Sequence, residues 1–185
     1  MTCSLCHRND AAAPLLFAAL AGDCERCRSQ AADGRTFRPE PPPRQRVILV
    51  ACGKAKRAEP CAARDLYTSG RFALARATAE ASGSPWFILS ALHGLTDPAR
   101  VLAPYDQTLA DRLPYERARW ALAVLRDLST RFPGQALDVV ILGSNAYGSP
   151  LLAAVSPAWG WTIRTPLGGL TTGATLAKLS AGVEL

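Results

Sequence analysis

The sequence of 185 residues contains no long apolar run, no recognisable export signal and few acidic residues. A helix that crosses a membrane needs about 18 or more consecutive apolar residues, so we expect no membrane association. The first ten residues, MTCSLCHRND, lack the basic-then-apolar order of a secretory signal, which predicts a cytoplasmic protein. In that compartment the six cysteines are better explained as metal ligands or free thiols than as disulfides.

The shortage of acidic residues gives the chain a basic balance. Fifteen Asp and Glu residues stand against 21 Lys and Arg, which gives a net charge of +6. Such a balance indicates a polyanionic partner, and we predict nucleic acid, with DNA favoured over RNA. The solvated surface charge of an arginine-rich protein encoded by a high-GC genome explains the same balance. Charge alone therefore does not choose between these two explanations.

Four of the cysteines lie in the first 28 residues, in two C-x2-C pairs separated by 17 residues: Cys3, Cys6, Cys24 and Cys27. Two such pairs supply the four thiolates of a tetrahedral zinc site. A site closed by four thiolates leaves no open position for catalysis, so the predicted cofactor is a structural Zn²⁺. We therefore predict a zinc-knuckle module at 1–28, followed by a proline-rich linker at 29–45.

The remainder of the chain, 46–185, alternates apolar strand patterns with amphipathic helix patterns. This alternation predicts an α/β fold with three layers, in which helices flank a mainly parallel sheet. The segment 90–113 has few helical signals, and a loop of that length is typical of a functional site. The predicted strands are 47–51, 86–89, 139–142 and 162–164, and the predicted helices are 70–81, 114–131, 150–155 and 174–180.

Polar and titratable residues follow the predicted strands. Because ligands of open α/β sheets bind at the carboxyl ends of the strands, we expect these residues to form one site. The predicted catalytic residues are His93 and Asp106. The predicted substrate-binding residues offer cations, hydroxyls, aromatic rings and glycine-rich backbone, which suits a ligand that carries a phosphate or a nucleobase. They are Cys52, Lys54, Lys56, Tyr67, Ser90, Tyr105, Ser144, Asn145, Gly168, Gly169 and Thr171.

Several of these residues have a structural alternative. His93 precedes a glycine and could be a turn residue, and Asp106 could cap a turn. Cys52 could be a nucleophile activated by the neighbouring lysines, or a cysteine that packs at the end of a buried strand. The glycine-rich turn at 166–173 lacks both G-x-G-x-x-G and the Walker pattern, so it does not indicate a nucleoside triphosphate site.

Four segments, in order along the chain, resemble a bacterial and phage domain of unknown function: LVACGKAKR, ARDLYTSGRFALARATAE, WFILSALHGLTDPARVLAPYDQTL and TPLGGLTTGATLAKL. That domain is similar to the YaaA peroxide-stress family, which shares the S-x-x-[HY]-G-L and P-Y elements. The resemblance covers about 46–179 and excludes the zinc module. It implies DNA binding, protection from oxidative damage and a connection with enzymes of modified nucleobases. Family members often have Glu where this chain has Gly168.

Three hypotheses follow for the function. The first is an enzyme that processes nucleic-acid bases by cleaving or exchanging an N-glycosidic bond, with lysines on phosphate, a tyrosine stacked on the base, and His93 or Asp106 as the catalytic group. The second is a non-catalytic DNA-binding or stress- and defence-associated module, which the missing Glu at Gly168 favours. The third is a cysteine hydrolase that uses Cys52 with His93.

Overall fold

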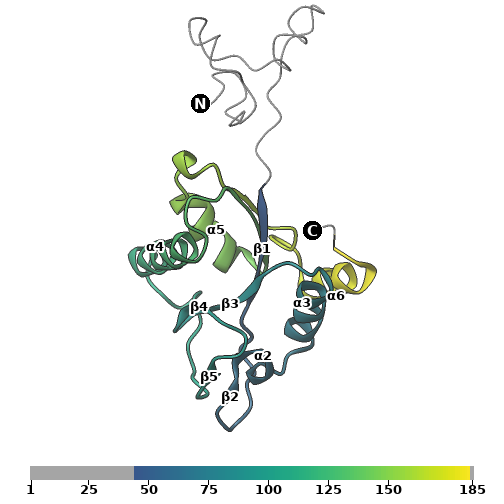
Figure 1. Cartoon of the computed structure of the whole chain (residues 1–185). Helices are drawn as coiled ribbons and strands as arrows, with labels where there is room; N and C mark the ends of the chain where they lie inside the picture. Colours follow the sequence, from purple (N-terminus) through teal and green to yellow (C-terminus); the bar gives the residue numbers. More distant parts are fainter. Residues whose placement is uncertain (1–43, 184–185) are drawn as a thin grey trace, which may run out of the picture. The chain divides into compact units, whose positions relative to one another are not determined.

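The computed structural model describes residues 44–183 (Figure 1). The predicted zinc-knuckle module, with Cys3, Cys6, Cys24 and Cys27, lies outside the described residues, so the zinc site stays a prediction. Within 44–183, no group of three or more His, Cys, Asp or Glu side chains is arranged to hold a metal ion. In the same range no helix is long and apolar enough to span a bilayer.

The centre of the fold is a five-stranded sheet with the strand order β4-β3-β1-β6-β7. Four of its strands, β1, β3, β6 and β7, are paired in parallel, while β4 is antiparallel to β3 at one edge. β1 lies in the middle, and Val47, Ile48, Leu49 and Val50 are all fully buried in it, as expected for a strand covered on both faces. The bounds are β1 Gln45–Ala51, β3 Trp86–Ser90, β4 Gly94–Thr96, β6 Leu137–Leu142 and β7 Thr162–Arg164.

Helices flank the sheet in two pairs. α4 (Pro114–Arg131) packs with α5 (Asn145–Ala154), and α3 (Gly70–Ala81) packs with α6 (Thr172–Ala181). Figure 1 shows the two pairs on opposite sides of β1. The mixed α/β fold with a mainly parallel sheet and flanking helices is therefore confirmed.

Two helices form where local signals predict them. Ser69 caps α3, because its hydroxyl oxygen accepts a hydrogen bond from the backbone N–H of Phe72 at 3.3 Å. In α4, Pro114 occupies the first turn, and the carboxylate of Glu116 accepts a hydrogen bond from the backbone N–H of Leu113 at 2.8 Å. Each helix buries the apolar face expected from its sequence period.

The structure differs most from the predicted elements in two places. The predicted loop at 90–113 contains β4 and a short strand β5 (Val101–Leu102), which pairs antiparallel with β2 (Cys61–Ala62) just before α2 (Ala63–Leu66). α5 begins at Asn145 rather than at Pro150. Gly148 weakens the local helical signal, but a Cβ there would lie 2.6 Å from Cγ2 of Thr165, so close packing requires the glycine.

The order of the strands creates a topological switch point. The chain leaves β1 through α3 toward β3, and it leaves β6 through α5 in the opposite direction toward β7. The neighbouring carboxyl ends of β1 and β6 therefore lead to opposite faces, which is where open α/β sheets bind ligands. The two strand ends approach closely, since a Cβ at Gly143 would lie 2.6 Å from Cβ of Ala51.

Candidate functional site

A thiol and a phenol meet at the switch point. The backbone N–H of Cys52 donates to the carbonyl oxygen of Leu89 at 3.0 Å, which holds the residue at the end of β1. Its Sγ atom lies 3.1 Å from Oη of Tyr147, which comes from α5. Both side chains are buried, with exposures of 6% for Cys52 and 8% for Tyr147. Sequence reasoning missed Tyr147, because it predicted that this helix begins at Pro150.

A chain of three hydroxyl groups lies at the same edge of the sheet. Oγ of Ser90 is 2.8 Å from Oη of Tyr105, which is 2.9 Å from Oη of Tyr67. The backbone N–H of His93 donates to Oγ of Ser90 at 2.9 Å. Ser90 is fully buried at the end of β3. The structure thus brings together four residues that the sequence predicts for the site, from three separate segments.

Counting protons shows what this chain of hydroxyls offers to a ligand. Three hydroxyls carry three protons, but the two links between them use only two. One O–H therefore remains and can donate to a further acceptor: it is on Ser90 or Tyr67 if both links point the same way, and on Tyr105 if that hydroxyl accepts from both neighbours.

Trp120 fixes the position of this chain from the side of α4. Its indole N–H donates to the carbonyl oxygen of Ser90 at 2.9 Å. Its ring meets the ring of Tyr147 edge-on, with 5.8 Å between centroids and 75° between planes. The helical period of α4 places Trp120 on the buried face of the helix, but that period carries no sign of the polar contact.

Lys56 places a positive charge beside the phenols. Its Nζ atom lies 4.2 Å from the centroid of the Tyr105 ring and 5.8 Å from that of Tyr67. The same ammonium donates to the carbonyl oxygen of Lys54 at 3.2 Å, while the Lys54 side chain is exposed. Lys56 also forms an antiparallel bridge with Tyr67, which ties this loop to the segment before α3.

The environment keeps the phenols and the imidazole of the site neutral. Burial raises the pKa of Tyr67 to about 12, and it also raises the pKa values of Tyr105 and Tyr147. Burial, together with the nearby charge of Arg100, lowers the pKa of His93 below its ordinary value of 6.5. At neutral pH the phenols are therefore hydrogen-bond donors, and His93 is a neutral imidazole that can accept a proton. The His93 ring meets the Tyr105 ring edge-on, with 5.4 Å between the ring centroids.

The second predicted catalytic residue, Asp106, takes no part in these hydrogen bonds. Asp106 is exposed and follows Tyr105 in the chain. Its carboxylate accepts no hydrogen bond from any residue of 44–183, so its role stays a prediction. The same holds for the proposed pair of Cys52 and His93: within the described part of the chain, the thiol is hydrogen-bonded to Tyr147 and not to the imidazole.

The remaining predicted residues form a separate small group between β6 and α6. Asn145 is exposed and lies against Gly168, where a Cβ would be 2.5 Å from the Asn145 Oδ1. Ser144 precedes α5, Gly169 has a φ of +75°, and the hydroxyl of Thr171 caps α6 by accepting from the N–H of Ala174. A glutamate at Gly168 would have to displace the Asn145 amide. Among the described residues no hydrogen bond joins this group to the hydroxyl chain.

The α/β domain matches the model of one protein family. The model of a family of unknown function, DUF6884, matches residues 47–181. The chain belongs to DUF6884. The DUF6884 match includes every predicted catalytic and substrate-binding residue and leaves out the four cysteines of the predicted zinc module. No curated protein matches the chain, and no solved structure does. The predicted resemblance to a domain of unknown function is therefore confirmed at the level of the DUF6884 family.

Proposed function

We propose that the carboxyl edge of the sheet binds a nucleobase-bearing ligand and that the protein cleaves or exchanges an N-glycosidic bond. The observation that supports this most is the largely buried chain of Ser90, Tyr105 and Tyr67 at the carboxyl edge, with a neutral His93 beside it. A hydroxyl with a spare proton suits the carbonyl and nitrogen acceptors on the edge of a base.

The cations and the titratable groups have distinct roles in this proposal. Lys56 lies next to the phenols and, with the exposed Lys54, holds the phosphate of the ligand. The Lys56 ammonium covers one face of the Tyr105 ring, so that face is not available for stacking on a base. The tyrosines therefore contribute hydrogen bonds to the ligand as well as aromatic surface. His93 accepts a proton, and the carboxylate of Asp106 stabilises positive charge on the sugar.

In hydrolysis, the oxygen of a water molecule forms a bond to the anomeric carbon of the sugar. The carbon–nitrogen glycosidic bond breaks, and its electron pair stays on the nucleobase. The proton of the water passes to the imidazole of His93, and a solvent proton neutralises the departing nitrogen. In exchange, a second nucleobase takes the place of the water. Neither reaction requires an oxidant or a reductant.

The wider setting of this proposal comes from the sequence. A cytoplasmic, phage-associated protein with a distant relation to the YaaA peroxide-stress family would meet DNA, and the four-cysteine module with its structural Zn²⁺ would add contact with the strand. These expectations concern the partner and the location, and the chemistry proposed for the carboxyl edge does not depend on them.

A second candidate is a non-catalytic DNA-binding or stress-associated module. Two observations favour it: Gly168 stands where the resembled family often has Glu, and the exposed Asp106 has no hydrogen-bond partner within 44–183. In that case the carboxyl edge would hold a ligand without converting it.

Single-turnover assays of the full chain on a modified-base oligonucleotide distinguish the candidates. His93→Gln should lower the rate about a hundredfold or more, because general acid–base groups contribute at least that much. The wild-type rate should fall as the pH drops below 6.5 and protonates His93, with the midpoint at its lowered pKa. Arg126→Gln, on the exposed side of α4, is the matched control and should leave the rate unchanged. A wild-type protein that binds the oligonucleotide but releases no base would exclude the enzyme and leave the second candidate.

A further inference from the structure

The opposite end of the sheet carries an open hollow of about 770 Å³ surrounded by arginines. Its centre is Asp138, which is the register partner of Arg46 on β1 and of Thr162 on β7. The carboxylate accepts hydrogen bonds from Arg46 at 3.1 Å and from Arg164 at 2.7 Å. The lining residues are Arg44, Arg46, Asp138, Thr162, Ile163 and Arg164.

The hollow has an excess of positive charge. Three guanidinium groups and one carboxylate line it among the described residues. Burial raises the pKa of Asp138, but the hydrogen bonds from Arg164 and Arg46 outweigh burial and lower it overall, so Asp138 is ionised at neutral pH. The Arg46 and Arg164 side chains are 43% and 42% exposed, so solvent and ligands reach them. Guanidinium groups in such a position bind phosphate through paired hydrogen bonds.

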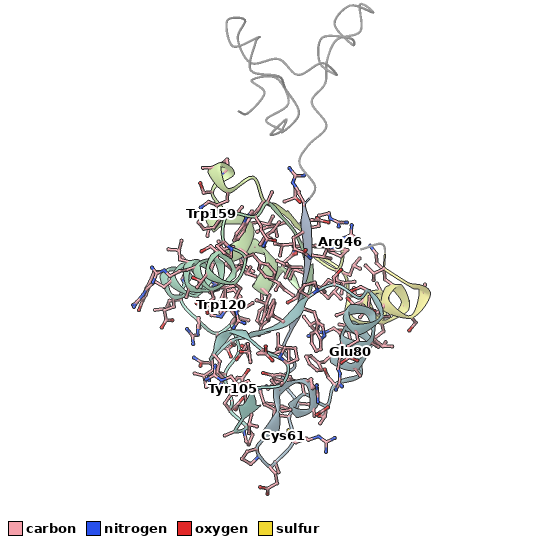
Figure 2. All side chains as sticks on the ribbon, in the orientation of Figure 1. Arg46, Cys61, Glu80, Tyr105, Trp120 and Trp159 are labelled. Carbon is pink, nitrogen blue, oxygen red and sulfur yellow. The ribbon has the colours of Figure 1, made fainter. Side chains whose placement is uncertain are left out.

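An aromatic pair adjoins these arginines. The rings of Trp159, in the short helix η2 (Pro157–Trp159), and Trp161 lie 4.8 Å apart, and Trp159 is 38% exposed. Nε of Arg44 donates to the carbonyl oxygen of Gly160 at 3.2 Å, which joins the tryptophan segment to the hollow. Figure 2 shows Arg46 and Trp159 at one end of the domain and Tyr105 toward the other.

We propose that the hollow and Trp159, together the arginine–tryptophan surface, bind single-stranded nucleic acid. The arginines contact the phosphates, and the exposed indole stacks on a base. Positive charge alone would attract any polyanion. An exposed indole selects an unpaired base, because bases within a duplex are already stacked on each other. The surface lies apart from the carboxyl edge, so binding here does not require turnover.

Binding of a fluorescently labelled oligothymidine to the full chain, followed by anisotropy over a range of salt concentrations, tests this surface. Arg46→Gln should weaken binding at every salt concentration and reduce the slope of log K against log salt by about 0.7, because one phosphate contact is lost. Asp138→Asn should strengthen binding, because it removes the carboxylate at the centre of the hollow. This opposite effect separates electrostatic attraction from damage to the fold, which thermal unfolding of both variants checks.

The stacking contact has its own pair of variants. Trp159→Ala should weaken binding about tenfold, since stacking on one base contributes on the order of 1–3 kcal/mol. Trp159→Phe should retain most of the affinity. Arg126→Gln and Ser149→Ala, both at exposed helix positions, are the controls and should bind like the wild type. None of these variants alters the carboxyl edge, so failure of the glycosidic proposal would leave these results intact.

Two results would overturn the proposal. One is that Arg46→Gln, Asp138→Asn and Trp159→Ala all bind oligothymidine with the affinity of the wild type. The other is that a duplex or inorganic polyphosphate competes as strongly as the single strand at equal phosphate concentration, which would remove the role of the exposed indole.

Discussion

The two ends of the sheet hold their polar groups in opposite ways. At the carboxyl end, neutral hydroxyls and a thiol are buried and hydrogen-bonded to one another, and Ser90 has no exposed surface. At the amino end, ions pair with ions on an open surface, where the Arg46 side chain is 43% exposed. The same sheet therefore supports a buried neutral network at one end and a solvated charged one at the other.

This difference determines what each end contributes. Removing one partner of a buried hydrogen bond leaves a polar group without water, which costs about 1–3 kcal/mol. Breaking an exposed ion pair costs only about 0.2–1 kcal/mol, because water and salt screen the charges. We therefore expect substitutions at the carboxyl end to change stability and site geometry. Substitutions at the amino end should change binding without unfolding the protein.

Two tryptophans, one at each end, should show the largest contrast. Trp120→Ala should lower the free energy of unfolding by about 3–5 kcal/mol, because it leaves a cavity and removes the hydrogen bond to the Ser90 carbonyl. Trp159→Ala should lower it by less than about 1 kcal/mol, because that ring is on the surface. Urea unfolding of both variants measures the difference. Equal losses would show that the two ends do not differ in burial as described.

The hydroxyl chain should give the next largest effect. Ser90→Ala should destabilise the protein by about 1–3 kcal/mol, since it leaves the His93 N–H and the Tyr105 hydroxyl without their partner. The control is Ser149→Ala on the exposed side of α5, which should change stability by less than about 0.5 kcal/mol. If Ser90→Ala were as stable as this control, the chain of hydroxyls would not be formed in solution.

The smallest effect is expected from the ion pairs of the amino end. Because the pKa of Asp138 is lowered in the folded protein, its ionised form stabilises the fold above about pH 4. That contribution is lost as the pH falls through the lowered pKa. Asp138→Asn should therefore cost about 0.2–1 kcal/mol at pH 7 and nothing in strong acid. A difference from the wild type that does not change with pH would mean that packing, and not charge, is responsible.

The sequence predicted the elements whose signals are local. Ser69 and Pro114 mark the beginnings of α3 and α4, and both helices have the predicted bounds. β4 and β5 escaped prediction because strands of two or three residues are defined by their pairing partners, which lie elsewhere in the chain. Tyr147 was not predicted because Gly148 weakens the helical signal of the first turn of α5. The reason for a glycine at this position is its close packing against Thr165, which the sequence does not show.

The same distinction applies to the two polar regions. Residues at the carboxyl end of a strand, such as Cys52 and Ser90, could be predicted from the rule that parallel strands present their carboxyl ends together. The arginine–tryptophan surface could not, because Arg46 and Asp138 are 92 residues apart and meet only through the register of β1 with β6. No short sequence motif specifies that register.

The most direct test of a ligand site at the carboxyl edge uses the scarcity of histidine, since the chain has only His7 and His93. The imidazole proton signal of His93, assigned with His93→Gln, should shift saturably when a nucleoside monophosphate is added. Lys56→Gln should weaken this response, and Arg46→Gln should leave it unchanged. A His93 signal that does not move while the nucleotide demonstrably binds the protein would contradict a site at this edge.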